Sequence, residues 1–193
     1  MVFIVMGVSG CGKTAVGKLL ADRIAFPFHD ADDFHSAESM EKMKSGRPLT
    51  DDDRIPWLFD LAVHVAQWNR HGGAVLACSA LKEKYRAILN WNGKEEVAYV
   101  YLKGEPELIL GRMKKRAEHF FPPELLESQF KDLEEPSNAM TVTIEKRPDD
   151  VRADIIGPLL YGDRHGIGGL FQVTIEKRPD DICSDIIGEI IRR

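Results

Sequence analysis

The sequence predicts a single α/β domain over residues 1–193, with a central parallel sheet between layers of helices. Short apolar segments of strand length alternate with longer amphipathic segments, and this alternation is typical of parallel sheets. The first apolar segment, residues 2–6, runs directly into GVSGCGKT at 7–14, and a helical pattern follows. A strand, a glycine-rich loop and a helix in this order are expected to bind phosphate.

Four strands are expected before residue 104. Residues 2–6 form a continuous apolar run, as a strand that is buried on both faces requires. The other three are short apolar segments that alternate with helical patterns. They lie at 26–30, 74–80 and 97–102.

The helices are expected between these strands. The segment 13–24 carries an apolar face, and Ser36 is a candidate cap for a helix that stops at Gly46. A long amphipathic helix at 55–73 ends at a glycine pair. Two further helices are expected at 82–90 and 106–119.

The end of the chain contains a repeat. VTIEKRPDD occurs at 142–150 and again at 173–181, and DIIG follows each copy. Two copies are too few for a solenoid, so we interpret 142–157 and 173–188 as a duplicated strand and helix. The first copy is predicted to supply the last strand of the sheet, because only a short link precedes it. The second copy, whose helix has the more continuous apolar face, is the alternative.

Composition limits the classes of partner. A net charge of −5 argues against a general nucleic-acid binder, which needs a basic face. No apolar run approaches the roughly 20 residues that span a bilayer, and the first residues lack the basic region of a signal peptide. Cys11, Cys78 and Cys183 form neither a disulfide framework nor a metal-ligand spacing. We therefore expect a cytoplasmic protein without nucleic-acid or membrane partners.

The glycine-rich segment 7–14, called the phosphate loop below, lets successive backbone N–H groups converge on phosphate oxygens. Lys13 is expected to reach the β- and γ-phosphates of a nucleotide, and the Thr14 hydroxyl to ligate Mg²⁺. Cys11 either fills a variable position or is a reactive thiol, because a helix N-terminus lowers the pKa of a thiol. GTPases, ATP-driven motors and small-molecule kinases all use such a loop, so it does not name the reaction.

An acidic turn follows the second strand, with Asp30, Asp32 and Asp33, and His35 beyond them. Ligands of open α/β sheets bind outside the carboxyl ends of the strands, so this turn is expected to face the phosphate loop. One carboxylate can orient an acceptor hydroxyl and take its proton while another holds a metal-bound water. A solvated turn, or a helix cap by Asp33, is the alternative.

Arginines indicate an anionic ligand. Arg54 precedes the helix expected at 55–73, and Arg86 lies within a later helix. Each guanidinium can bind a carboxylate or phosphate bidentately, although a surface ion pair would also explain each one.

A second pair of arginines, Arg112 and Arg116, lies on one face of a basic helix. The segment from about 112 to 131, which is interrupted at FFPP, is expected to be a mobile lid whose arginines close on ATP phosphates. A solvated basic face is the alternative.

Six segments over roughly residues 3–150 carry a family resemblance. They are VMGVSGCGKT, DADDFH, KMKSGRPLTDDDRIPWL, LACSALKEKYR, HFFPPELLESQF and LEEP. Together they resemble gluconate kinases of the thermoresistant-gluconokinase type, which belong to the shikimate-kinase-like small-molecule kinases. The resemblance implies a three-layer P-loop kinase fold with a helical lid, which is frequently dimeric, so a homodimer is a candidate assembly. It also implies that ATP, with Mg²⁺, phosphorylates D-gluconate to 6-phospho-D-gluconate.

The resemblance also implies roles for the residues that match the family's motifs. Asp32 is expected to be the general base, and Lys13 and Arg116 complete the catalytic set. Mg²⁺ is expected on Thr14 and Asp30. The expected ATP contacts are Gly7, Val8, Ser9, Gly10, Cys11, Gly12, Lys13, Thr14, Arg112 and Arg116, and the expected gluconate contacts are Asp30, Asp32, His35, Arg54, Lys82, Arg86 and His119.

Two other functions stay open at this point. Another small-molecule kinase, such as a shikimate kinase, would share the phosphate loop, although DRIPWL and CSALKEKYR argue against it. A nucleotide-binding module without a small acceptor is the alternative from a different class. A GTPase of that kind would carry an NKxD-type sequence, which this sequence lacks.

Overall fold

The computed structural model describes residues 1–91, 97–114 and 123–144. Five strands in this part of the chain form one parallel sheet in the order β2-β3-β1-β4-β5, which confirms the predicted fold class. The elements, in chain order, are β1 (Val2–Met6), α1 (Lys13–Ile24), β2 (Phe28–Asp30), the 3₁₀ helix η1 (Ala31–Phe34), α2 (Ala37–Lys44), α3 (Asp51–Arg70), β3 (Ala74–Ala77), α4 (Glu83–Leu89), β4 (Val97–Lys103), α5 (Pro106–Lys114), α6 (Pro123–Asp132) and β5 (Met140–Thr143).

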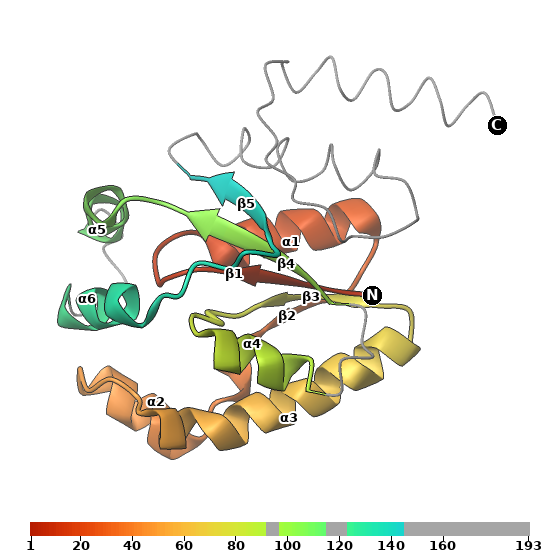
Figure 1. The fold of residues 1–193 in the computed structure, drawn as a ribbon, viewed down its shortest axis with the longest axis horizontal. Coiled ribbons are helices and arrows are strands. Elements are labelled where there is room, and N and C mark those ends of the chain that lie inside the picture. Colours follow the sequence, from red (N-terminus) through yellow and green to blue (C-terminus); the bar gives the residue numbers. More distant parts are fainter. Residues whose placement is uncertain (92–96, 115–122, 145–193) are drawn as a thin grey trace, which may run out of the picture.

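The central strand β1 is buried on both faces, as its continuous apolar run predicts. Phe3 and Val5 belong to the apolar cluster that α1 covers, whereas Val2 and Ile4 belong to the cluster that α3 and α4 cover. Figure 1 shows the resulting layers, with α1 on one face of the sheet and α3 and α4 on the other. None of the helices described here is both long and apolar enough to cross a membrane.

Helix α3 begins at Asp51, earlier than the start at Ile55 that the sequence predicts. Thr50 and Asp53 cap this end reciprocally: the Thr50 side chain accepts from the Asp53 N–H, and the Asp53 carboxylate accepts from the Thr50 N–H at 2.6 Å. The helix continues through Pro56, which cannot donate a helical hydrogen bond. The expectation that Arg54 precedes a helix is therefore wrong, because Arg54 lies in the first turn of α3.

The last strand of the described sheet, β5, contains the beginning of the first copy of the repeat. Val142 pairs with Leu102 of β4, and both Val142 and Ile144 are buried. The first two residues of this copy therefore lie in the described sheet, and the choice between the two copies for the last strand stays a prediction. The rest of that copy and the whole second copy, residues 145–193, lie outside the described residues.

The five described strands end at one edge of the sheet, the edge to which the arrows point in Figure 1. The phosphate loop follows β1 at this edge, and η1 follows β2. Helices α5 and α6 lie beyond the same edge (Figure 1). The fold thereby places the phosphate loop and the acidic turn together, as the sequence predicts, and adds α6 to them.

Candidate active site

Three glycines of the phosphate loop, Gly7, Gly10 and Gly12, have a positive φ, and the last two face different surroundings. Gly12 precedes α1 with φ +104°, and a Cβ at this position would meet open space. Gly10 has φ +83°, and a Cβ there would lie 2.6 Å from the Met113 side chain of α5. The loop is therefore packed against α5 at one point and open at another, as a phosphate cradle requires.

A cavity of about 680 Å³, called the loop cavity below, lies along the open part of the phosphate loop. Its volume is in the range of small-molecule sites. The backbone N–H groups at the start of α1 carry a partial positive charge, which favours an anion there. The lining residues are Ser9, Gly10, Gly12, Lys13, Thr14, Ala15, Lys18, Asp30, Asp32 and Met113.

Thr14 and Asp30, the two expected magnesium ligands, lie side by side in the loop cavity. The Thr14 hydroxyl donates to Asp30 Oδ2 at 2.8 Å, and Asp30 Oδ1 accepts from the Asp32 N–H at 3.2 Å. Within the described ranges, no three His, Cys, Asp or Glu side chains gather as a metal site. One hydroxyl and one carboxylate suit Mg²⁺, which takes few protein ligands and completes its shell with phosphates and water.

A second cavity, of about 110 Å³, lies next to the first and is called the side cavity below. Ser9, Lys13 and Asp32 line both cavities, so a ligand in one meets a ligand in the other at these three residues. The side cavity is lined by Ser9, Lys13, Asp32, His35, Met43, Pro48, Leu49, Arg54, Trp57, Ser79, Leu125, Ser128 and Gln129.

Asp32 stands at the junction of the two cavities. Its side chain is 81% exposed, and the His35 Nε2 atom is 3.9 Å from Asp32 Oδ1. The carboxylate is therefore available to a ligand in either cavity. Such a position suits a group that accepts a proton from a bound hydroxyl.

His35 lies in the wall of the side cavity. Its ring stacks on Trp57 with centroids 4.2 Å apart, and its side chain is 5% exposed. Burial lowers the pKa of His35 despite the opposing charge of Asp32, and Arg54 lowers it further. Its Nδ1 is buried and makes no hydrogen bond to the described residues. A neutral imidazole with this unpaired nitrogen can bind a hydroxyl group.

Arg54 and Lys82 share one carboxylate, that of Asp132 at the end of α6. Arg54 Nη1 lies 3.4 Å from Asp132 Oδ2, and Lys82 Nζ lies 3.0 Å from Asp132 Oδ1. Arg54 lines the side cavity, and Lys82 is linked to it through Asp132. The structure therefore brings these two predicted cations together, with Arg54 facing the cavity.

A further carboxylate, Asp51, supports Lys82 from the other side. Lys82 Nζ donates to Asp51 Oδ1 at 3.2 Å, and Lys84 and Tyr85 also donate to this carboxylate. Burial opposes the charge of Lys82, but hydrogen bonds to Asp132 and Asp51 raise its pKa above the ordinary value. Lys82 therefore stays cationic across the physiological pH range.

Arg86 has surroundings that the sequence did not predict. It is 8% exposed, and its Nη1 donates to the carbonyl oxygens of Ala80 at 2.9 Å and Leu81 at 3.0 Å. Ala80 has φ +44°, so these bonds support a strained turn after β3. Arg86 thus holds the loop that leads to Lys82, and the gluconate contact that the family resemblance implies stays a prediction.

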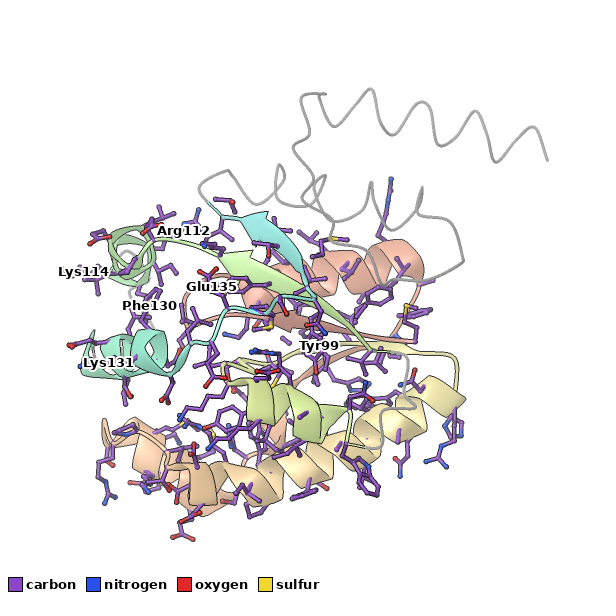
Figure 2. The ribbon with its side chains drawn as sticks, viewed as in Figure 1. Tyr99, Arg112, Lys114, Phe130, Lys131 and Glu135 are labelled. Carbon is purple, nitrogen blue, oxygen red and sulfur yellow. The ribbon has the colours of Figure 1, made fainter. Side chains whose placement is uncertain are left out.

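The predicted lid is described only in part. Arg112 on α5 donates to the carbonyl oxygen of Ile144, and Figure 2 shows its side chain directed from α5 toward β5. Arg116 and His119 lie outside the described residues. The expected contacts of these lid residues with ATP and gluconate therefore stay predictions.

Cys11 of the phosphate loop is 2% exposed. Burial raises the pKa of its thiol, although the Lys13 charge and hydrogen bonds in the loop act in the opposite direction. The protonated thiol is therefore favoured, which supports the interpretation of Cys11 as a filler of a variable position and not as a reactive thiol.

The residues that sequence reasoning missed lie mainly on α6. Leu125, Ser128 and Gln129 line the side cavity, and Asp132 holds the two cations. Gln129 also bonds to Ser9 in the phosphate loop. The sequence did contain a pattern that could have indicated Gln129. This residue follows the buried Leu125 by one helical turn and so places a polar group on an apolar face of the helix.

Comparison with known proteins identifies the family. A shikimate kinase family model matches residues 9–147. A probable gluconokinase of Rattus norvegicus is 45% identical over 179 residues, which cover 82% of this chain and 97% of that protein. The thermoresistant gluconokinase of Escherichia coli (strain K12) is 38% identical over 162 residues, covering 80% of this chain and 91% of the relative. The chain belongs to the gluconokinase family.

Solved structures agree with this family. The crystal structure of a gluconokinase from Sinorhizobium meliloti 1021 has a TM-score of 0.73 and 36% identity, covering 79% of this chain and 87% of that one. A sugar kinase from Janibacter sp. has a TM-score of 0.72 and 41% identity, covering 78% and 89%. These likenesses confirm the predicted P-loop kinase fold and the resemblance on which the predicted site residues depend.

Proposed function

We propose that this member of the gluconokinase family transfers the γ-phosphoryl group of ATP to a hydroxyl of D-gluconate, which yields 6-phospho-D-gluconate and ADP. The observation that carries the proposal is that the loop cavity and the side cavity meet at Ser9, Lys13 and Asp32. A small acceptor in the side cavity would present its hydroxyl to a phosphate held by the loop. The gluconokinases among its relatives supply the identity of the acceptor.

The phosphate loop, residues 7–14, would hold the phosphates of ATP. Lys13 Nζ donates to the Val8 carbonyl at 3.1 Å, so its ammonium already lies over the loop. In the transfer step this charge would stabilise the negative charge on the γ-phosphoryl oxygens. Thr14 and Asp30 would hold Mg²⁺, which would supply positive charge against the negative charge of the phosphates.

Asp32 would act as the general base. It is exposed at the junction of the cavities, where the acceptor hydroxyl and the phosphate must meet. The carboxylate would orient the hydroxyl and take its proton as the oxygen attacks phosphorus.

Gluconate would be oriented by its carboxylate and its hydroxyls. Arg54 offers a guanidinium to the carboxylate, and Lys82 adds positive charge through the shared Asp132. His35 Nδ1 would bind a hydroxyl. Arg86 would contribute through the loop that it supports, or by direct contact as the family resemblance implies.

The remaining expectations are proposals from the family resemblance. They are contacts of Arg112 and Arg116 with ATP and of His119 with gluconate, a single domain with a lid at about 112–131, a cytoplasmic location and a homodimer. Light scattering of the purified protein tests the homodimer.

The experiment is an ADP-release assay with ATP and Mg²⁺ over a panel of acceptors. We expect ADP release with D-gluconate and none above background without an acceptor. Glucose, which lacks the carboxylate, is the matched control for recognition by Arg54, and shikimate tests the other kinase function. ADP release that is equal with and without gluconate would support a nucleotide-binding module, and release with shikimate alone would support a shikimate kinase.

A further inference from the structure

Gln129 of α6 makes two hydrogen bonds to one residue of the phosphate loop, Ser9. The Ser9 backbone N–H donates to Gln129 Oε1 at 2.6 Å, and Gln129 Nε2 donates to Ser9 Oγ at 3.0 Å. A backbone N–H can only donate, so the amide oxygen must face it and the amide nitrogen must face the hydroxyl. The orientation of this side-chain amide is therefore fixed by chemistry.

This orientation constrains the hydroxyl of Ser9. Because Ser9 Oγ accepts a hydrogen bond from Gln129, its own proton must point away from the amide. Ser9 lines both the loop cavity and the side cavity. The hydroxyl is thus held as a donor at the place where the two cavities meet.

Helix α6 is itself anchored close to Gln129 by two residues that follow it. Asp132, one turn further along, pairs with Arg54 and Lys82. Phe130 packs against the apolar cluster under α1, and Figure 2 shows it between α6 and α5. The ion pairs of Asp132 with Arg54 and Lys82 therefore also help to hold Gln129 against the phosphate loop.

We propose that Gln129 is a positioning residue for phosphoryl transfer, which holds Ser9 so that the Ser9 hydroxyl donates to the phosphoryl group as it passes between the cavities. This proposal rests on the proposed function. Negative charge is spread over the oxygens of the transferring group in the transition state, and a donor that is already oriented stabilises it. Gln129 acts through Ser9, so its loss is expected to slow the chemical step more than it weakens binding of gluconate.

The test compares Gln129→Met, Ser9→Ala and the double variant in the full chain with ATP and gluconate. Methionine keeps the length of glutamine and removes both hydrogen bonds. We expect Gln129→Met to lower kcat by about tenfold and to change the KM for gluconate by less than about twofold. The double variant should have a kcat within about twofold of the slower single variant, because both changes remove the same donor.

Lys131→Gln is the matched control. Lys131 is on α6, is 73% exposed, pairs with Glu127 at 2.7 Å and lies on the outer side of the helix (Figure 2). Its substitution should leave kcat and both KM values unchanged. Melting temperatures of all variants are measured alongside; if Gln129→Met melts well below the wild type, Ser9→Ala alone carries the test, with the same expected fall in kcat.

The possible results distinguish a failure of this inference from a failure of the proposed function. A wild-type protein without gluconate-dependent ADP release overturns the proposed function and, with it, the role of Gln129. If the wild type is active, two results overturn only the role of Gln129. One is a wild-type kcat in Gln129→Met or Ser9→Ala, and the other is a double variant in which the two losses of kcat multiply. A lower kcat with an unchanged KM and no further loss in the double variant supports it.

Discussion

The Thr14 hydroxyl lies 2.8 Å from Asp30 Oδ2, and this hydrogen bond joins the start of α1 to the end of β2. The next carboxylate, Asp32, does not share it: its backbone N–H binds Asp30 Oδ1 while its side chain stays exposed. The two acidic residues therefore have different surroundings. One is placed beside the predicted magnesium ligand, and the other is free to meet the acceptor.

This difference predicts distinct effects of the two amide substitutions. Asp32→Asn should lower kcat by at least about a hundredfold, the usual scale for a lost general base, with little change in nucleotide affinity. Asp30→Asn should instead raise the Mg²⁺ concentration needed for half-maximal turnover. Steady-state kinetics with a Mg²⁺ titration measures both. If Asp30→Asn lowers kcat strongly and Asp32→Asn lowers it only slightly, Asp30 is the general base.

Arg54→Lys should weaken gluconate binding more than ATP binding. A guanidinium can bind Asp132 and a substrate carboxylate with different N–H groups, whereas an ammonium offers a single point charge. We expect the KM for gluconate to rise about tenfold and the KM for ATP to change little. An equal rise in both KM values would contradict a substrate-side role for Arg54.

The buried His35 predicts a loss of stability in acid. Burial lowers its pKa in the folded protein, so between that value and the ordinary value of about 6.5 the unfolded chain binds more protons. Its contribution to the free energy of unfolding is therefore complete above about pH 6.5 and is lost as the pH falls below it. Urea unfolding at pH 7.5 and pH 5.5 should show a larger loss for the wild type than for His35→Gln.

His29 makes a similar contribution to both proteins in that comparison, since burial and the nearby His64 lower its pKa too. The difference between wild type and variant therefore reports on His35. Equal losses of unfolding free energy would show that His35 is not held neutral by folding.

Truncation after Leu160 is predicted to leave a folded, active kinase. The first copy of the repeat already fills the sheet position beside β4, where Val142 is buried. The truncated chain should stay soluble, melt within a few degrees of the full chain and keep its gluconate-dependent ADP release. An insoluble or inactive product would mean that residues 161–193 are needed to complete the fold.

Features set by neighbouring residues could be predicted from the sequence. The apolar run of β1, the glycines of the phosphate loop and the Ser36 cap of α2 are local, and each appears in the structure where it was expected. The predicted start of α3 was wrong because the cap at Thr50 uses Asp53, a shorter partner than the usual Glu or Gln.

Contacts between distant segments could not be predicted in this way. Gln129 meets Ser9, and Asp132 meets Arg54, only because the fold returns α6 to the edge of the sheet after β4. The burial of Arg86 was also hidden, because a charged residue in a helix indicates an exposed or ligand-binding position until its carbonyl partners are seen. These residues complete the candidate site.

The central claim, direct transfer between two cavities that meet at Lys13, is tested most directly by the stoichiometry of products. ADP and phosphogluconate are quantified in the same reaction for the wild type and for Lys13→Ala, whose folding is checked by its melting temperature. We predict one phosphogluconate for each ADP in the wild type. We predict almost no phosphogluconate with Lys13→Ala, because several kcal/mol of charge stabilisation at the γ-phosphate is lost. ADP formed without phosphogluconate, or near-normal turnover in a folded Lys13→Ala, would contradict the account.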